Sequence, residues 1–162
     1  LLGEGCHFFD LLHFLAGADP VSVHTVAVAT DRRDLPPTAN FTSTIQFADG
    51  SVAQVQYSSA GPRALPKERI EVLGGGVAAV LDDFTQLTTY DQRSAHTEKL
   101  RAPDKGQVEL LRQFTLAARG QGPRPMSTRD LLVSSALTLS AQESLTRGAP
   151  VDVRSWMEAL AL

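Results

Sequence analysis

The sequence has few of the features that mark several large classes of protein. It contains one cysteine, Cys6, which excludes an internal disulfide and fits a reducing cytoplasm. No signal-peptide pattern opens the chain, and its longest apolar runs are four or five residues, too short to span a bilayer. Charged residues are few and nearly balanced in sign, with 15 Lys and Arg against 18 Asp and Glu. We therefore expect a cytoplasmic protein that binds neither nucleic acid nor a membrane.

The composition that is present suits one ordinary globular domain. The chain has 162 residues, of which 43% are hydrophobic. A domain of this size buries roughly 70% of the surface that its unfolded chain exposes. The first residue is Leu1 rather than an initiator methionine. We expect the chain to be processed or to be part of a longer protein, and we treat residues 1–162 as a single domain.

Hydrophobic periodicity predicts a helix, then a run of strands, then further helices. The first helix lies within residues 1–16 and is stopped by Gly17 and Pro20, and residues 31–40 form a loop. Strands are expected at residues 21–30, 41–47, 51–57, 68–73 and 77–81, and near 86–91 and 96–101. Helices are expected at about 105–119, at 127–146 and in a short segment at 156–160. This order indicates an α+β fold with an open, mainly antiparallel β-sheet and helices on one face.

Residues 41–57 predict a hairpin whose register can be chosen from its side chains. A two-residue loop would mix apolar and polar faces, whereas the three-residue loop Ala48–Asp49–Gly50 keeps them apart. The second register pairs Phe41 with Tyr57, Ser43 with Val55 and Ile45 with Ala53. The opposite face is rich in Thr and Gln, and we expect it to meet water or a partner subunit.

Two helix starts carry capping signals. Ser127 and Asp130 have the spacing of a capping box, and Asp104 is expected to be the N-cap of the helix at 105–119. In that helix Val108, Leu111 and Phe114 fall to one side.

Three apparent motifs are better explained without chemistry. The glycines 74–76 lie between two strands, whereas a phosphate site needs amides at a helix N-terminus. Cys6 and His7 are adjacent on a helix, so their side chains diverge. The four histidines lack the paired spacing of metal ligands. We therefore predict no cofactor-binding residue and no metal site within the chain.

Glu4 and His7 form the best candidate catalytic site. They are three residues apart, and a helical projection sets them at the edge of an apolar stripe made by Phe8, Leu11, Leu12 and Leu15, with Phe9 and His13 pointing away. A carboxylate beside a histidine can set its tautomer and raise its basicity. The alternatives are a structural histidine in the core, or an extended segment before Cys6 that would prevent the pairing.

The segment Gly3-Glu4-Gly5-Cys6-His7-Phe8-Phe9-Asp10 resembles the start of the C-terminal domain in the glucose–fructose oxidoreductase, inositol dehydrogenase and MocA family. In that family a Gly-x-His-x-x-Asp element opens a helix soon after the dinucleotide-binding domain. The similarity continues in order through residues 47–51, 66–72, 81–84, 104–106, 143–145 and 148–151.

The resemblance implies a role for each half of a two-domain, NAD(P)-dependent enzyme. An N-terminal Rossmann domain, absent from these residues, would bind NAD or NADP, and this chain would be the substrate-binding and oligomerisation domain. His7 matches the catalytic histidine and Asp10 the aspartate after it, which we interpret as structural. Many members have an aspartate four residues before the histidine, where this sequence has Gly3, with Glu4 next to it.

These observations predict a domain of a dehydrogenase that acts on a secondary alcohol of a sugar, nucleotide-sugar or cyclitol and is inactive alone. Catalysis is assigned to His7 and Glu4, and substrate binding to Tyr57, Ser58 and Lys67 from their places near or after a strand end. The expected partners are a sugar-like small molecule and further copies of the chain, which would associate through the sheet face. The alternative is a non-enzymatic dimerisation or scaffold domain.

Overall fold

The computed structural model describes residues 2–29 and 38–160. The chain divides into two compact units, one made of Leu1–Ala60 and Met126–Leu162 and the other of Gly61–Pro125. Each unit contains one four-stranded antiparallel sheet. The predicted α+β class with antiparallel strands is confirmed, and the strands form two sheets rather than one.

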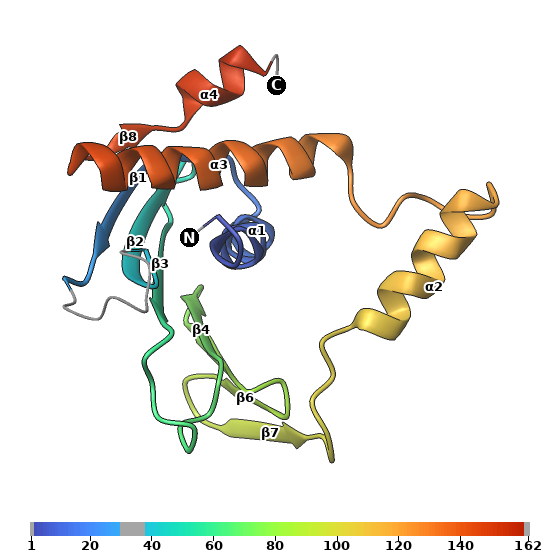
Figure 1. The fold of residues 1–162 in the computed structure, drawn as a ribbon. Coiled ribbons are helices and arrows are strands. Elements are labelled where there is room, and N and C mark those ends of the chain that lie inside the picture. Colours follow the sequence, from blue (N-terminus) through green and yellow to red (C-terminus); the bar gives the residue numbers. More distant parts are fainter. Residues whose placement is uncertain (1, 30–37, 161–162) are drawn as a thin grey trace. The chain divides into compact units, whose positions relative to one another are not determined.

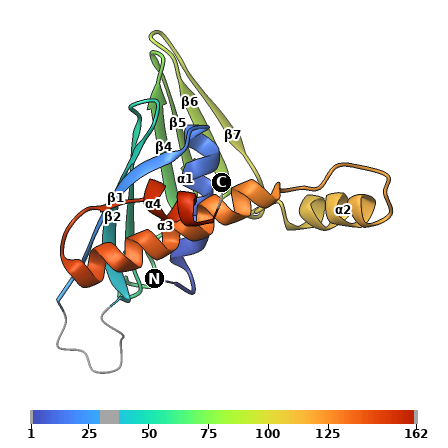
Figure 2. The same ribbon diagram turned by 90° about the horizontal axis from the view of Figure 1, so that it is seen from above.

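The first unit is a sheet with two helices packed on one face (Figures 1 and 2). Its strand order is β3-β2-β1-β8. The strands are β1 (Pro20–Ala27), β2 (Asn40–Phe47), β3 (Val52–Ser58) and the short β8 (Val151–Asp152), and the helices are α1 (Gly5–Ala16), α3 (Thr128–Arg147) and α4 (Arg154–Ala159). The pairing of β8 with β1 has no counterpart in the sequence prediction, because two residues carry no periodic signal.

The predicted hairpin register is confirmed. Phe41 pairs with Tyr57, Ser43 with Val55 and Ile45 with Ala53. Gly50 has φ 88°, the left-handed conformation that the three-residue loop requires. The predicted loop at 31–40 falls almost entirely outside the described residues.

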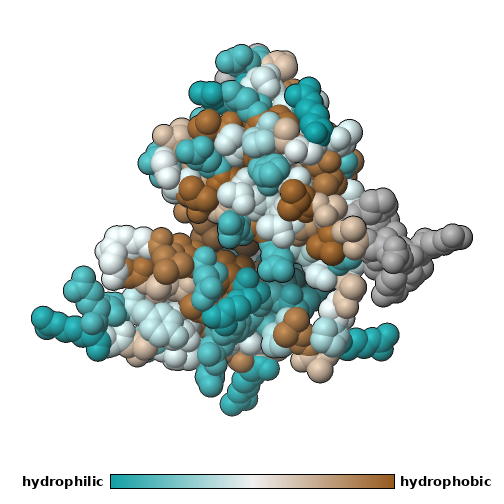
Figure 3. Space-filling model, turned by 90° about the vertical axis from the view of Figure 1, so that its left-hand side faces the viewer, coloured by the Kyte–Doolittle hydropathy of each residue, from teal (hydrophilic) through white to brown (hydrophobic). Residues whose placement is uncertain are grey.

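The face of this sheet that carries the pairs Phe41–Tyr57 and Ile45–Ala53 contributes to the core of the first unit. Buried side chains from the strands and helices meet there: Phe9, Val23, Phe41, Ile45, Phe47, Val55, Val133, Ala136, Leu137, Ala141, Val153 and Met157. The opposite face carries Thr and Gln side chains together with exposed valines, namely Val26 and Val52. Figure 3 shows polar and apolar side chains interspersed on the side of the molecule that it views.

The predicted orientation of α1 is wrong. Phe9 is fully buried and His13 is 9% exposed, whereas Leu15 is 40% exposed and both Glu4 and His7 are exposed. The buried positions Gly5, Phe9 and His13 follow a spacing of four, with Phe8, Leu12 and Ala16 partly buried beside them. In the helical projection, Leu11 and Leu15 place the apolar stripe beside the face that is buried in the structure. A projection uses only the hydrophobicity of the residues and contains no information on which side of the helix the sheet lies.

Helix α3 begins and ends as its sequence indicates. The Ser127 side chain accepts from the backbone N–H of Asp130, and the Asp130 carboxylate accepts from the N–H of Ser127, so the capping box is confirmed. The helix ends at Gly148, whose φ is 65°. At its first turn Arg129 donates two hydrogen bonds to Asp19, of 2.9 and 2.8 Å, which ties α3 to the segment after α1.

The second unit is a meander with order β4-β5-β6-β7. Its strands are β4 (Arg69–Gly74), β5 (Val77–Asp82), β6 (Gln86–Tyr90) and β7 (Ala95–Lys99), which confirms the four predicted strands. Within Gly61–Pro125, Thr88 is the only buried residue. This sheet therefore lacks a helix-covered core of the kind found in the first unit.

Helix α2 (Gln107–Ala118) confirms the predicted helix but not its predicted N-cap. The N-cap is Gly106, at φ 73°, and the Asp104 carboxylate instead accepts from the Gly106 N–H within the preceding loop. Val108, Leu111 and Phe114 share one side as expected and are 83%, 66% and 60% exposed. None of the helices in the described ranges is long and apolar enough to cross a bilayer.

Candidate functional site

A pocket of about 510 Å³ opens on the first unit between the start of α1 and the middle of α3. Its volume falls in the range of about 300–1,000 Å³ that small-molecule sites occupy. Half of the residues that line it are apolar or weakly polar and half carry strong hydrogen-bonding groups. The lining consists of Leu2, Cys6, His7, Asp10, Met126, Leu131, Ser134, Ser135, Thr138 and Leu139.

His7 lies in the first turn of α1 with its side chain exposed. Asp10 follows it by three residues on the same helix face, and both side chains line the pocket. The site therefore places an accessible imidazole and a carboxylate in one cavity. An accessible imidazole can exchange a proton with a bound molecule.

Helix α3 supplies hydroxyl groups to the opposite wall. Ser134 Oγ donates to Asp10 Oδ1 over 2.6 Å, and this contact joins the two helices. Thr138 Oγ1 donates to the backbone oxygen of Ser134 over 2.7 Å, and Ser135 Oγ donates to that of Leu131 over 2.8 Å. The Asp10 carboxylate thus has a dedicated partner, which agrees with a structural role and also sets it facing the pocket.

Glu4 does not join this group. It is the N-cap residue of α1, with φ −126°, and its exposed side chain makes no capping hydrogen bond. Its backbone oxygen accepts from the His7 N–H at 3.2 Å. Within the described residues no hydrogen bond or ion pair joins the two side chains. Residues three apart are neighbours on a helix face only where both belong to the helix. Because α1 begins at Gly5, Glu4 lies outside it and is not held facing His7.

The three predicted substrate-binding residues lie outside the pocket lining. Tyr57 is half-buried, with its ring stacked on Phe41 at a centroid distance of 5.4 Å and near Phe8 at 5.8 Å. Ser58 donates to Asn40 Oδ1 over 3.0 Å. Lys67 is exposed and belongs to the second unit. Tyr57 and Ser58 thus have evident structural partners in the first unit.

The pocket residues that sequence reasoning missed are those of α3. Ser134 and Thr138 are 8% and 5% exposed. They are four residues apart, so they share a helix face, next to the apolar positions Val133 and Leu137. A pair of buried hydroxyls at this spacing is the signal that could have found them.

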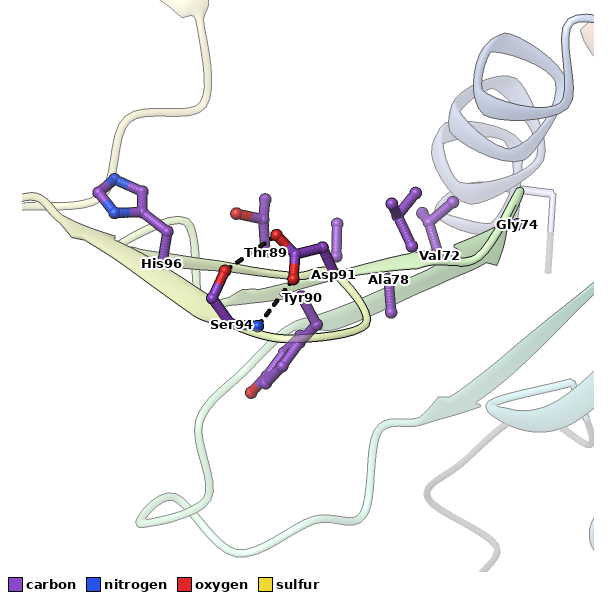
Figure 4. A pocket seen from close by; sticks show the side chains of 10 residues that line it. Val72, Gly74, Ala78, Thr89, Tyr90, Asp91, Ser94 and His96 are labelled. Carbon is purple, nitrogen blue, oxygen red and sulfur yellow. Dashed lines mark hydrogen bonds between the residues drawn. The ribbon is translucent and has the colours of Figure 1, made fainter.

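A second pocket, of about 460 Å³, lies on the β4–β7 sheet of the second unit (Figure 4). Apolar side chains such as Val72 and Ala78 line much of it, and Asp91, Ser94 and His96 stand at one end. The Asp91 carboxylate accepts from Arg93 N and Ser94 N, each at 2.7 Å, and from Ser94 Oγ at 2.9 Å. These hydrogen bonds, from Arg93 first, hold the pKa of Asp91 below its ordinary value. The Asp91 carboxylate therefore stabilises the turn between β6 and β7.

Comparison with known families covers part of the lining of each pocket. Residues 1–77, which include α1, β1, β2 and β3, match the model described as the GFO/IDH/MocA C-terminal domain. Residues 1–77 therefore belong to the GFO/IDH/MocA C-terminal domain family. The matched segment contains His7 and Asp10, which line the first pocket, and it stops before most of the residues that line the second.

Solved structures extend the likeness in fold over nearly the whole chain. An oxidoreductase from Agrobacterium radiobacter, in complex with NAD+, L-tartaric acid and magnesium, has a TM-score of 0.77 at 18% identity over 94% of this chain and 48% of its own. UDP-N-acetylglucosamine 3-dehydrogenase from Acidithiobacillus ferrooxidans has a TM-score of 0.73 at 22% identity, over 86% and 45%. A levoglucosan dehydrogenase in complex with NADH has a TM-score of 0.72 at 17% identity, over 93% and 49%.

These likenesses show that the chain shares its fold with one part of each of these proteins. The chain spans about half the length of each of these proteins. No curated protein matches the sequence significantly.

The glycines 74–76 do not have the geometry of a dinucleotide phosphate site. Gly74 pairs with Val77, and Gly75 and Gly76 have φ values of 59° and 80°, so the glycines close a hairpin. A pyrophosphate would need converging amides at a helix N-terminus. Residues 2–29 and 38–160 also contain no cluster of three His, Cys, Asp or Glu side chains that could hold a metal.

Proposed function

We propose that this chain is the substrate domain of a cytoplasmic NAD(P)-dependent oxidoreductase that acts on a secondary alcohol of a sugar-like molecule. NAD or NADP would be bound mainly by an N-terminal domain outside these residues, so the chain alone would be inactive. The family match over residues 1–77 and the likeness to dehydrogenases of sugars and nucleotide-sugars support this proposal.

The observation that carries the proposal is the position of His7. Its imidazole is exposed at the start of α1, and it lines a pocket with Asp10 and the α3 hydroxyls. In the proposed reaction His7 takes the proton of the substrate hydroxyl when the alcohol is oxidised and returns it in the reverse direction. Asp10, fixed by Ser134, is a positioning residue for the wall of the site. Glu4 is exposed and does not line the pocket, so this scheme assigns the proton transfer to His7 without Glu4.

The test compares His7→Asn with His96→Asn in the full-length protein that contains this chain. His96 is an exposed histidine on β7 of the second unit and does not line the first pocket. Loss of a general acid–base should lower turnover by about 100-fold or more. His96→Asn should leave turnover unchanged. Equal turnover of the native protein and His7→Asn would refute the assignment of His7.

A binding experiment tests the division of labour between the two halves. Calorimetry on residues 1–162 should detect no binding of NAD or NADP, while the full-length protein should bind one of them. Tight binding of either nucleotide to the isolated chain would contradict the proposal that the cofactor site lies outside it.

We propose that the outward face of the β3-β2-β1-β8 sheet joins copies of the chain. Thr44, Gln46 and Gln54 point to this side, and Val26 and Val52 are 51% and 62% exposed on it. The replacement Val26→Lys should shift the native oligomer towards monomer in light-scattering measurements. Val108→Lys, on α2 of the second unit, is the matched control at another exposed valine.

A further inference from the structure

The α3 side of the pocket offers hydrogen-bond acceptors only. A serine or threonine hydroxyl has one proton to donate and lone pairs to accept with. Ser134 gives its proton to Asp10, Ser135 to Leu131 and Thr138 to Ser134. In this arrangement the hydroxyl oxygens of Ser135 and Thr138 present lone pairs to a ligand.

Asp10 extends this acceptor surface. An ionised carboxylate accepts and does not donate. Its Oδ1 receives the Ser134 proton, and within the described residues its Oδ2 has no hydrogen-bond partner. Asp10 is the only acidic residue among those that line the pocket, so its carboxylate is the one source of negative charge in the lining. The imidazole of His7 and the weakly donating thiol of Cys6 lie on the same helix as Asp10 and are the donors in the lining.

A ligand that fits this wall must supply the protons. Neutral hydroxyls and a protonated amine can each donate to the oxygens of Asp10, Ser135 and Thr138, whereas a carboxylate or phosphate cannot. An anionic group would also meet the charge of Asp10 in a partly desolvated cavity, where like charges repel more strongly than in water.

We propose that this pocket selects a donor-rich, non-anionic ligand, a neutral or amino-bearing polyol, and that Asp10 is the residue that rejects anionic analogues. The inference rests on the proposed function for the identity of the site and goes beyond it by naming the charge class of the substrate. Apolar lining from Met126, Leu131 and Leu139 suits the carbon faces of such a molecule.

The test uses three probes with one ring: glucose, glucosamine and glucuronate. Their binding to the full-length protein is measured by ligand-observed NMR, at a pH where the amine is protonated and the carboxylate ionised. Glucose and glucosamine should bind, and glucuronate should bind at least about tenfold more weakly, as expected for like charges at a few ångströms. Equal affinity for glucose and glucuronate, or no binding of any probe, would overturn the inference.

Two variants test whether Asp10 causes the preference for glucose over glucuronate. Asp10→Asn keeps the shape, lets the amide oxygen accept from Ser134, and should bring glucose and glucuronate within about threefold of each other. Asp49→Asn, on the exposed hairpin turn, should keep the native preference. An unchanged preference in Asp10→Asn would overturn the role of Asp10.

Thr138→Val covers the case in which Asp10→Asn fails to fold. Valine keeps the shape of threonine and removes one acceptor, so glucose should bind several-fold more weakly while the preference over glucuronate persists. Native affinity for glucose in Thr138→Val would contradict the acceptor wall. These measurements need no turnover, so a protein that discriminates as stated yet oxidises no alcohol would refute the proposed function and leave this inference standing.

Discussion

Ser134 Oγ on α3 donates a hydrogen bond of 2.6 Å to Asp10 Oδ1 on α1, across a separation of 124 residues in sequence. The contact joins the two helices that line the pocket, and it orients the carboxylate one turn after His7. Ser134 is 8% exposed, so its hydroxyl has little access to water as an alternative partner. The geometry of the site and the stability of the first unit therefore depend on the same bond.

Ser134→Ala should destabilise the protein by roughly 1–3 kcal/mol, the cost of removing a hydrogen bond to a charged group. Urea unfolding followed by circular dichroism measures the effect. The matched control is Ser135→Ala, because Ser135 is exposed and bonds only to the backbone of its own helix. That variant should lie within about 0.5 kcal/mol of the native protein. Equal loss in the two variants would mean that the link to Asp10 contributes nothing.

Phe9→Ala tests which face of α1 is buried. Phe9 is fully buried in the core of the first unit, so its truncation should cost about 3–5 kcal/mol. Phe14 belongs to the same helix and is 79% exposed, and Phe14→Ala should change the free energy of unfolding by less than about 0.5 kcal/mol. A loss of less than about 1 kcal/mol in Phe9→Ala would contradict the burial of this side chain in the core.

Local patterns in this sequence predict its elements well and their packing poorly. The Phe41–Tyr57 register follows from alternation and from the loop at Gly50, both of which are local. The buried face of α1 depends on where the sheet and α3 lie. Phe9 is buried because Val133, Leu137 and strand residues surround it, and no periodicity within α1 contains that information.

The candidate site shows the same limit. His7 could be found from a short motif, and its exposure in a pocket agrees with an active role. Ser134 and Thr138 could not be linked to it, because 124 residues separate Ser134 from Asp10 and the connecting chain gives no distance information. The predicted pairing of Glu4 with His7 assumes that the helix includes Glu4, whereas α1 begins one residue later, at Gly5.

Ser127→Ala should weaken the start of α3. The Ser127 hydroxyl accepts from the Asp130 N–H at 3.0 Å and donates to its carboxylate at 2.6 Å. Removing an N-cap serine costs about 1 kcal/mol. Ser127→Asn keeps an acceptor at the cap and should recover most of that loss in the same unfolding assay. A full loss in both variants would show that an acceptor at the cap is not sufficient and that the hydrogen bond from the Ser127 hydroxyl to Asp130 is required.

The Asp19–Arg129 pair should make part of the stability depend on pH. The hydrogen bonds from Arg129 hold the pKa of Asp19 below its ordinary value. A carboxyl whose pKa is lower in the folded state stabilises the fold above its unfolded pKa of about 3.9, and this contribution is lost as the pH falls through the folded-state value. Asp19→Asn should therefore be less stable than the native protein at neutral pH, and the difference should shrink below about pH 4.

Arg129→Met gives the reciprocal measurement for this pair. Without the guanidinium, Asp19 should titrate near its ordinary pKa in both states, so this variant and Asp19→Asn should show the same reduced dependence of unfolding free energy on pH. Asp152, whose pKa is also lowered, keeps its partner Arg154 in both variants and cancels in the comparison. Asp130 keeps its main partner Ser127, and in Arg129→Met it loses only the weakest of the causes that lower its pKa. Arg129→Met with the native pH dependence would show that Arg129 does not set the pKa of Asp19.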